Sequence, residues 1–143
     1  MHFTKLASLR HGLVAATVLC TIASLAGPAA ADDTKSLEVK RLVFARGIDN
    51  HEPQDPATAF SAKEDRVYAF VEVANPGADG NVEVVFQPPA GASFAVPLKV
   101  SGKANRFRTW AFTRRAHEAG EWTVVVRAPG GKALARQSFT VTK

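Results

Sequence analysis

The chain has one cysteine in 143 residues, Cys20, and it lies in an apolar N-terminal stretch. With no second cysteine, no disulfide can form within the chain, so a hydrophobic core must stabilise any folded domain. Histidine is also scarce beyond residue 31, where only His51 and His117 occur. These two histidines do not have metal-ligand spacing, and thiolate ligands are absent from that region. The sequence therefore predicts no metal and no cofactor.

The first 31 residues have the organisation of an export signal. A basic start containing Lys5 and Arg10 precedes an uncharged, mostly apolar run over residues 12–26. A Gly-Pro pair interrupts this run, and three alanines ending at Ala31 form a small-residue cleavage site. We expect cleavage after Ala31, a periplasmic or secreted location, and no transmembrane segment in the remaining chain. Residues 32–36 are expected to form a disordered tail.

From residue 37 onward, runs rich in Val, Phe and Thr alternate with turn residues, and no helical stretch of useful length occurs. This pattern predicts a single immunoglobulin-like antiparallel β-sandwich over residues 37–143. Pro97 indicates an edge strand, Leu134 falls out of phase and suggests a bulge, and residues 47–65 are expected to form an irregular crossover between sheets. The seven predicted strands are 37–45, 66–74, 81–87, 93–100, 106–113, 121–128 and 133–141.

Residues 118–124 read Glu-Ala-Gly-Glu-Trp-Thr-Val. An acidic, a small and an aromatic residue at this spacing, followed by a buried position, are typical of the start of the F strand in immunoglobulin-like sandwiches. In such domains the aromatic residue sits at the corner of the sheet. The motif supports the fold and carries no information about function.

Three segments together resemble a bacterial family of unknown function, DUF2914, over nearly all of residues 37–143. They are residues 45–53 (Ala-Arg-Gly-Ile-Asp-Asn-His-Glu-Pro), residues 105–110 (Asn-Arg-Phe-Arg-Thr-Trp), and residues 120–124 with 139–141. The resemblance implies a small β-domain of the bacterial envelope and supplies no catalytic residues. Family members usually carry a His-x-Trp-aromatic element on the third strand, where this chain has Val-Val-Phe-Gln at 84–87. Any binding by that element is therefore in doubt here.

Charge is unevenly distributed along the chain. Residues 32–83 carry 11 acidic and six basic side chains, whereas residues 84–117 carry no acidic and six basic ones. This basic segment is the candidate ligand-binding ridge, and it also contains Phe107, Trp110 and Phe112. Its six basic residues are Lys99, Lys103, Arg106, Arg108, Arg114 and Arg115.

Two interpretations of the ridge are open. In the structural one, a twist or bulge turns Trp110 and Phe112 into the core, and the arginines pair with the acidic N-terminal half. In the functional one, an exposed ridge of arginine and aromatic side chains recognises an anionic envelope polymer, a lipid headgroup or an acidic partner protein. Export makes nucleic acid an unsuitable partner.

The function predicted from these features is that of a non-enzymatic binding domain, acting through a strand edge or through the ridge. No catalytic residue is predicted, because no Gly-x-Ser-x-Gly elbow is present and the carboxylates of Glu64, Asp65 and Glu72 are expected to be rim charges. The alternative is a small envelope hydrolase or metal-dependent enzyme that uses His51 or His117.

Overall fold

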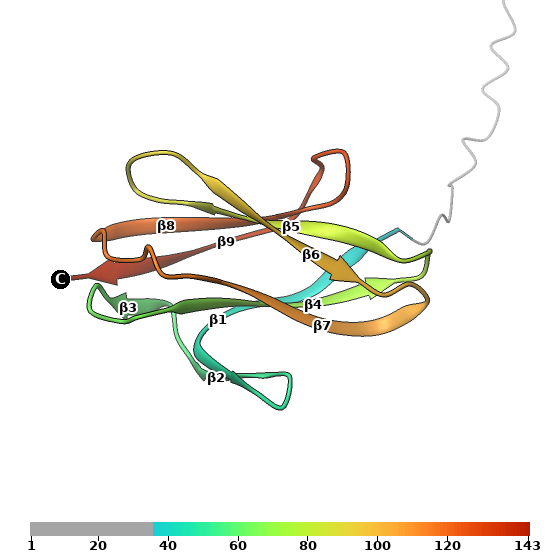
Figure 1. The fold of residues 1–143 in the computed structure, drawn as a ribbon, viewed down its shortest axis with the longest axis horizontal. Coiled ribbons are helices and arrows are strands. Elements are labelled where there is room, and N and C mark those ends of the chain that lie inside the picture. Colours follow the sequence, from blue (N-terminus) through green and yellow to red (C-terminus); the bar gives the residue numbers. More distant parts are fainter. Residues whose placement is uncertain (1–35) are drawn as a thin grey trace, which may run out of the picture. The chain divides into compact units, whose positions relative to one another are not determined.

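The computed structural model describes residues 36–143, which contain strands and no helix (Figure 1). The signal and most of the tail predicted for residues 1–36 lie outside this range. The described residues form nine strands: β1 (Glu38–Asp49), β2 (Glu52–Pro56), β3 (Ala59–Ser61), β4 (Val67–Asn75), β5 (Gly80–Gln87), β6 (Phe94–Val100), β7 (Ala104–Thr113), β8 (Gly120–Arg127) and β9 (Ala133–Thr142).

The strands form two sheets that pack face to face. Sheet A has the order β2-β1-β4-β7, and sheet B has the order β3-β9-β8-β5-β6. All neighbours are antiparallel except β3 and β9, which are parallel. Figure 1 shows β5, β8 and β9 of sheet B above β4 and β7 of sheet A, with β2 beneath sheet A. The predicted all-β sandwich is confirmed.

The core lies between the sheets and follows the alternation read from the sequence. Strand β4 contributes Val67, Ala69, Val71 and Val73, all fully buried. Strand β8 contributes every second residue from Trp122, whose ring stacks on Phe139 at 5.9 Å between centroids. Because side chains alternate across a strand, every second residue of these two strands points into the core.

The seven predicted strands all exist, and their ends agree within two residues except that the first continues to Asp49. The irregular crossover predicted for residues 47–65 is wrong in part, since that segment contains the end of β1, then β2 and β3. It does cross between sheets, because β2 pairs in sheet A and β3 in sheet B. Two prolines in β2 concealed the strand, since proline within a run argues against strand structure.

Two details of strand geometry are confirmed. Pro97 lies on β6, which is the edge strand of sheet B. The register between β8 and β9 shifts by one residue after Val126, which pairs with Ala135 while Arg127 pairs with Ala133. Leu134 is therefore the extra residue of a bulge, as its phase predicted.

At one end of the sandwich, the β4–β5 turn is fastened to the β6–β7 turn. The amide of Asn75 donates to the carbonyl oxygens of Ala78 at 2.9 Å and Ser101 at 3.2 Å, and its oxygen accepts from the Gly77 amide at 3.2 Å. The backbone amide of Gly102 donates to the Asp79 carboxylate at 2.6 Å. Both turns carry the chain from one sheet to the other, and these bonds hold the two turns together.

The Trp122 motif lies at the start of β8, where local contacts fix two of its residues. The Trp122 indole nitrogen donates to the carbonyl oxygen of Glu118, four residues earlier, at 3.0 Å. Gly120 has a φ of 136°, and a Cβ atom there would lie 2.9 Å from the Pro89 ring. The small residue is therefore required for both backbone conformation and close packing.

Candidate functional site

The site is built on the outer face of sheet A. The register of β4 against β7 aligns Tyr68 with Phe112, Phe70 with Trp110 and Glu72 with Arg108. Since side chains alternate, Arg106, Arg108, Trp110 and Phe112 share this outer face, while Ala111 and Thr113 face the core and are buried.

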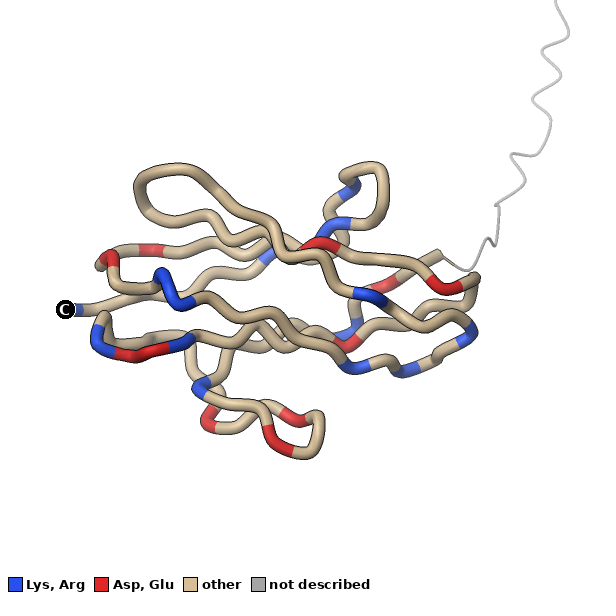
Figure 2. The backbone as a smooth tube through the Cα atoms, in the orientation of Figure 1, with Lys and Arg blue, Asp and Glu red and all other residues tan. Residues whose placement is uncertain are grey.

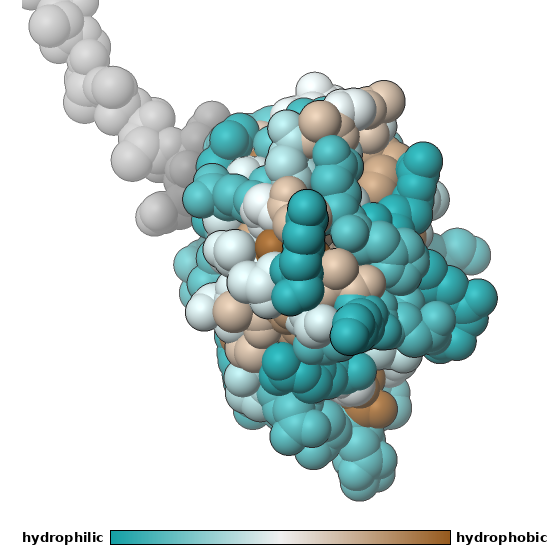
Figure 3. Space-filling view, turned by 90° about the vertical axis from the view of Figure 1, so that its left-hand side faces the viewer, coloured by the Kyte–Doolittle hydropathy of each residue, from teal (hydrophilic) through white to brown (hydrophobic). Residues whose placement is uncertain are grey.

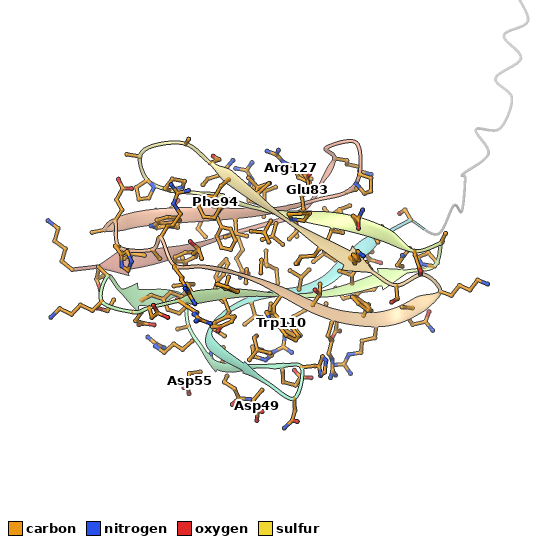
Figure 4. All side chains as sticks on the ribbon, viewed as in Figure 1. Asp49, Asp55, Glu83, Phe94, Trp110 and Arg127 are labelled. Atoms are coloured by element: carbon orange, nitrogen blue, oxygen red, sulfur yellow. The ribbon has the colours of Figure 1, made fainter. Side chains whose placement is uncertain are left out.

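The β1–β2 hairpin folds over part of this face. Its turn residues Asn50 and His51 have φ values of 48° and 59°, a conformation that asparagine tolerates well. The His51 ring lies 5.6 Å from the Trp110 ring in an edge-on arrangement. Phe70 is outside the main core yet 0% exposed, and the Arg41 guanidinium lies 5.4 Å from its ring. Figure 4 shows Trp110 between β7 and this hairpin, with Asp49 and Asp55 on the hairpin below it.

Five side chains of alternating charge fasten the hairpin to the sheet. The Glu52 carboxylate forms ion pairs with the guanidinium groups of Arg41 at 3.3 Å and Arg108 at 2.8 Å. The Glu72 carboxylate forms ion pairs with the Nε of Arg108 at 3.5 Å and the Nε of Arg106 at 2.7 Å. Figure 2 shows the acidic positions of the hairpin and the basic positions at the start of β7 on the same side of the molecule. We call these five residues the charge ladder, which has three arginines, two glutamates and a net charge of +1.

The ladder perturbs the groups that it joins. The hydrogen bond from Arg106 lowers the pKa of Glu72, although partial burial of that carboxylate opposes the effect. The same hydrogen bond raises the pKa of Arg106. Glu72 has a side chain that is 12% exposed, so its charge is compensated by the arginines rather than by water.

The structural interpretation of the ridge is right about the arginines and wrong about the aromatic rings. Arg106 and Arg108 do pair with glutamates from the acidic N-terminal half. Trp110 and Phe112 remain on the outer face, however, and Phe112 is 42% exposed. No twist carries the rings into the core, because β7 keeps regular register with β4 from Phe107 to Thr113.

A groove of about 560 Å³ lies between the hairpin turn and β7. Its lining residues are Asn50, His51, Arg106, Phe107 and Arg108. Three of these residues are consecutive on β7. The structure thus brings together His51, Arg106 and Arg108, which the sequence had singled out separately.

The other four ridge residues lie elsewhere. Lys99 is on β6 in sheet B, and Lys103 is in the β6–β7 turn with a φ of 55°. Arg114 and Arg115 follow the far end of β7, where their guanidinium groups lie 5.9 Å from the Phe112 ring and 5.0 Å from the Phe94 ring. The six residues do not form one continuous surface.

The two histidines are in different places. His117 has its Nδ1 2.9 Å from the carbonyl oxygen of Ala62, whereas His51 contacts Trp110. Within residues 36–143, neither imidazole has a hydrogen bond to a serine hydroxyl. The described chain also has no group of three or more His, Cys, Asp or Glu side chains arranged to hold a metal ion. The remaining carboxylates near β4 are ion-paired: Glu64 with Arg46 at 3.2 Å, and Asp65 with Arg66 at 3.0 Å.

Reasoning from the sequence missed Asn50 and Glu52 as members of the site. The sequence did contain a turn signal, the polar pair Asp49-Asn50. This pair lies where β1 ends, just before the segment that turns back and pairs with it as β2. The prolines that follow concealed the second strand, and so the hairpin that places Glu52 over β7 was not recognised.

The region around β7 also carries the likeness to known proteins. Residues 86–141 match the family DUF2914. DUF2914 is described as a protein family of unknown function, and this match confirms the resemblance predicted from the sequence. It includes the ridge residues from Lys99 to Arg115, whereas the hairpin residues His51 and Glu52 lie outside it.

Comparison with curated proteins gave no match. Among solved structures, a beta-glucosidase from Kluyveromyces marxianus is similar, with 14% sequence identity and a TM-score of 0.45. The similarity covers 76% of this chain and 14% of that one, so the chain spans about one seventh of the enzyme's length. Within the described residues, no helix is long and apolar enough to cross a membrane.

Proposed function

We propose that this chain is an exported, non-enzymatic binding domain of the bacterial envelope with an immunoglobulin-like sandwich, and that it holds an anionic partner in the groove beside β7. The observation that carries the proposal is the convergence of His51, Arg106 and Arg108 on one groove. The partner is an envelope protein or an anionic envelope polymer.

The charge ladder prepares the groove for an anion. Arg106 uses its Nε to bind Glu72, and its side chain is still 57% exposed. The terminal nitrogens of its guanidinium can therefore donate to a second acceptor in a fixed orientation. An arginine already oriented by a carboxylate loses less side-chain freedom when a ligand binds.

The test compares two double variants that remove the same charge. Arg106→Ala with Arg108→Ala removes the groove cations, whereas Lys132→Ala with Arg136→Ala removes two exposed cations from the β8–β9 turn and β9. We expect the first variant to lose retention on a dextran sulfate column at about 50 mM salt and the second to resemble the wild type. Retention of the wild type should fall at about 500 mM salt, because exposed charges are screened. Equal retention of both variants at low salt would contradict the proposal.

The catalytic alternative has its own variant. His117→Ala, which lies outside the groove, should leave the envelope partners captured by in-cell crosslinking unchanged, as long as circular dichroism confirms the strand content. Loss of a measurable turnover in that variant would instead favour an enzyme.

A further inference from the structure

The four edge strands of the described residues differ in how readily each could pair with an additional strand. Strand β2 contains two prolines and a left-handed Asp55, with a φ of 48°. Strand β3 has three residues, and β6 contains Pro97. Short strands and prolines are the usual protection of sheet edges, because they limit or interrupt the row of free backbone groups.

Strand β7 lacks this protection. It has ten residues and no proline, and β4 is its one paired neighbour in sheet A. In sheet B, the edge opposite the proline-bearing β6 is β3. Three residues give too few backbone hydrogen bonds to hold a partner strand, so β7 is the better edge.

The outer-face side chains of β7 define what a strand beside it would carry. Reading along the strand, Arg106 and Arg108 are followed by Trp110 and Phe112, and Arg114 comes just after the strand ends at Thr113. In the described part of the chain, no carboxylate lies within 4.0 Å of the Arg114 guanidinium. Directly opposite residues on paired strands interact most strongly, so acidic side chains suit the arginines and apolar ones suit the two rings.

A second copy of the chain is a poor occupant. Strand β7 has two arginines and no acidic residue, so antiparallel pairing of two copies can set arginine opposite arginine and cannot set an arginine opposite a carboxylate. Like charges directly opposite on neighbouring strands are destabilising. The occupant should therefore be a different polypeptide, with the opposite charge.

We infer that β7 accepts an extended acidic polypeptide segment as an additional strand of sheet A. The inference rests on the proposed function and specifies its partner. The segment alternates outward acidic and apolar residues, and its backbone bonds to the free edge of β7. Its acidic side chains reach the groove where Arg106 and Arg108 already lie.

The probe is the peptide Glu-Thr-Val-Thr-Val-Thr-Glu-Thr-Glu. In antiparallel pairing its last two glutamates lie opposite Arg108 and Arg106 and its valines opposite Phe112 and Trp110, while its first glutamate extends toward Arg114, beyond the end of β7. Two forms are N-methylated at alternate residues, one in each frame. Only one set of peptide amides faces β7 in a paired strand, so one form should bind about tenfold more weakly or worse, and the other should bind as the unmodified peptide does. Amide exchange should slow at alternate residues of β7 in the complex.

Three outcomes would overturn strand pairing. They are equal binding of both methylated forms, equal binding of a peptide of the same composition with its glutamates grouped at one end, and no peptide binding. Dextran sulfate retention separates this result from the proposed function. Retention that depends on Arg106 and Arg108 without peptide pairing leaves an anionic polymer as the partner, whereas loss of both effects removes the proposed function as well.

Discussion

At the scale of single residues, the positions least able to accept a larger side chain are those where a turn leaves no space for a Cβ atom. Gly102 is an example, because a Cβ atom there would lie 2.5 Å from the carbonyl carbon of Ala78 and 2.6 Å from the Asp79 nitrogen. Backbone atoms cannot move aside as the end of a flexible side chain can. The Asn75 hydrogen bonds to both turns keep this approach close.

We therefore expect Gly102→Ala to lower the free energy of unfolding by about 1–3 kcal/mol. Gly47→Ala is the matched control, since its Cβ would meet an ordinary contact of 3.7 Å with the Gln54 side chain. Urea denaturation followed by tryptophan fluorescence measures both. A Gly102→Ala protein as stable as Gly47→Ala would show that the two turns are not held together in solution.

Sequence reasoning was most reliable at this scale where local chemistry decides the result. The bulge at Leu134 and the place of Pro97 on an edge strand each follow from the conformational limits of one residue. Contacts between distant turns could not be predicted. Nothing in the local sequence indicates that Asn75 bonds to Ser101, since that contact depends on which connections between the sheets lie side by side.

At the scale of elements, the β1–β2 hairpin gives sheet A a covered and an open part. The covered part contains Phe70 and Trp110, and the open part contains Phe112. The charge ladder connects the two strands of the hairpin with β4 and β7. Its central carboxylate, Glu72, has a lowered pKa because Arg106 donates to it.

The lowered pKa of Glu72 makes its contribution to stability dependent on pH. A carboxylate whose pKa is lower in the folded state stabilises the fold above its unfolded pKa of about 4.3, and this stabilisation is lost as the pH falls through the folded value. We expect the melting temperature of the wild type to exceed that of Glu72→Gln at pH 7, and the difference to shrink at about pH 3. Differential scanning calorimetry over this range provides the measurement.

Glu121→Gln serves as the control, because Glu121 is exposed and no arginine or lysine nitrogen lies within 4.0 Å of it in the described residues. Its melting temperature should follow that of the wild type across the pH range. A constant difference between the wild type and Glu72→Gln would mean that the ladder does not couple protonation to folding.

The hairpin also marks the limit of what the sequence could predict about elements. Alternation of apolar residues revealed seven strands, because each of them has one face against the core. Strand β2 has no such face, since it packs over a sheet surface that is already outward, and its composition of Glu, Pro, Gln and Asp carries no period. The ridge was recognised as a set of charges, but its division between β6, β7 and the loop after β7 depends on the three-dimensional arrangement.

At the scale of the whole molecule, two sheets with an apolar interior account for a domain that has no cysteine beyond residue 31. Export by a signal that ends at Ala31 stays a prediction from the sequence.

We expect the protein purified from the periplasm or medium of an expressing bacterium to begin at Asp32. Intact-mass spectrometry gives the answer directly, since removal of 31 residues changes the mass by about 3 kDa. Replacing Ala29 and Ala31 with leucine should block cleavage and leave the longer species. A purified chain that still begins at Met1 would contradict export by a cleaved signal.

The placement of the two tryptophans has a practical consequence. Trp122 is 1% exposed within the sandwich, whereas Trp110 lies on the outer surface against His51. One indole should therefore report on global unfolding and the other on occupancy of the nearby groove. Proteins with a single Trp→Phe substitution would separate the two emission signals. The intrinsic fluorescence of the molecule can then follow unfolding of the sandwich and binding in the groove independently.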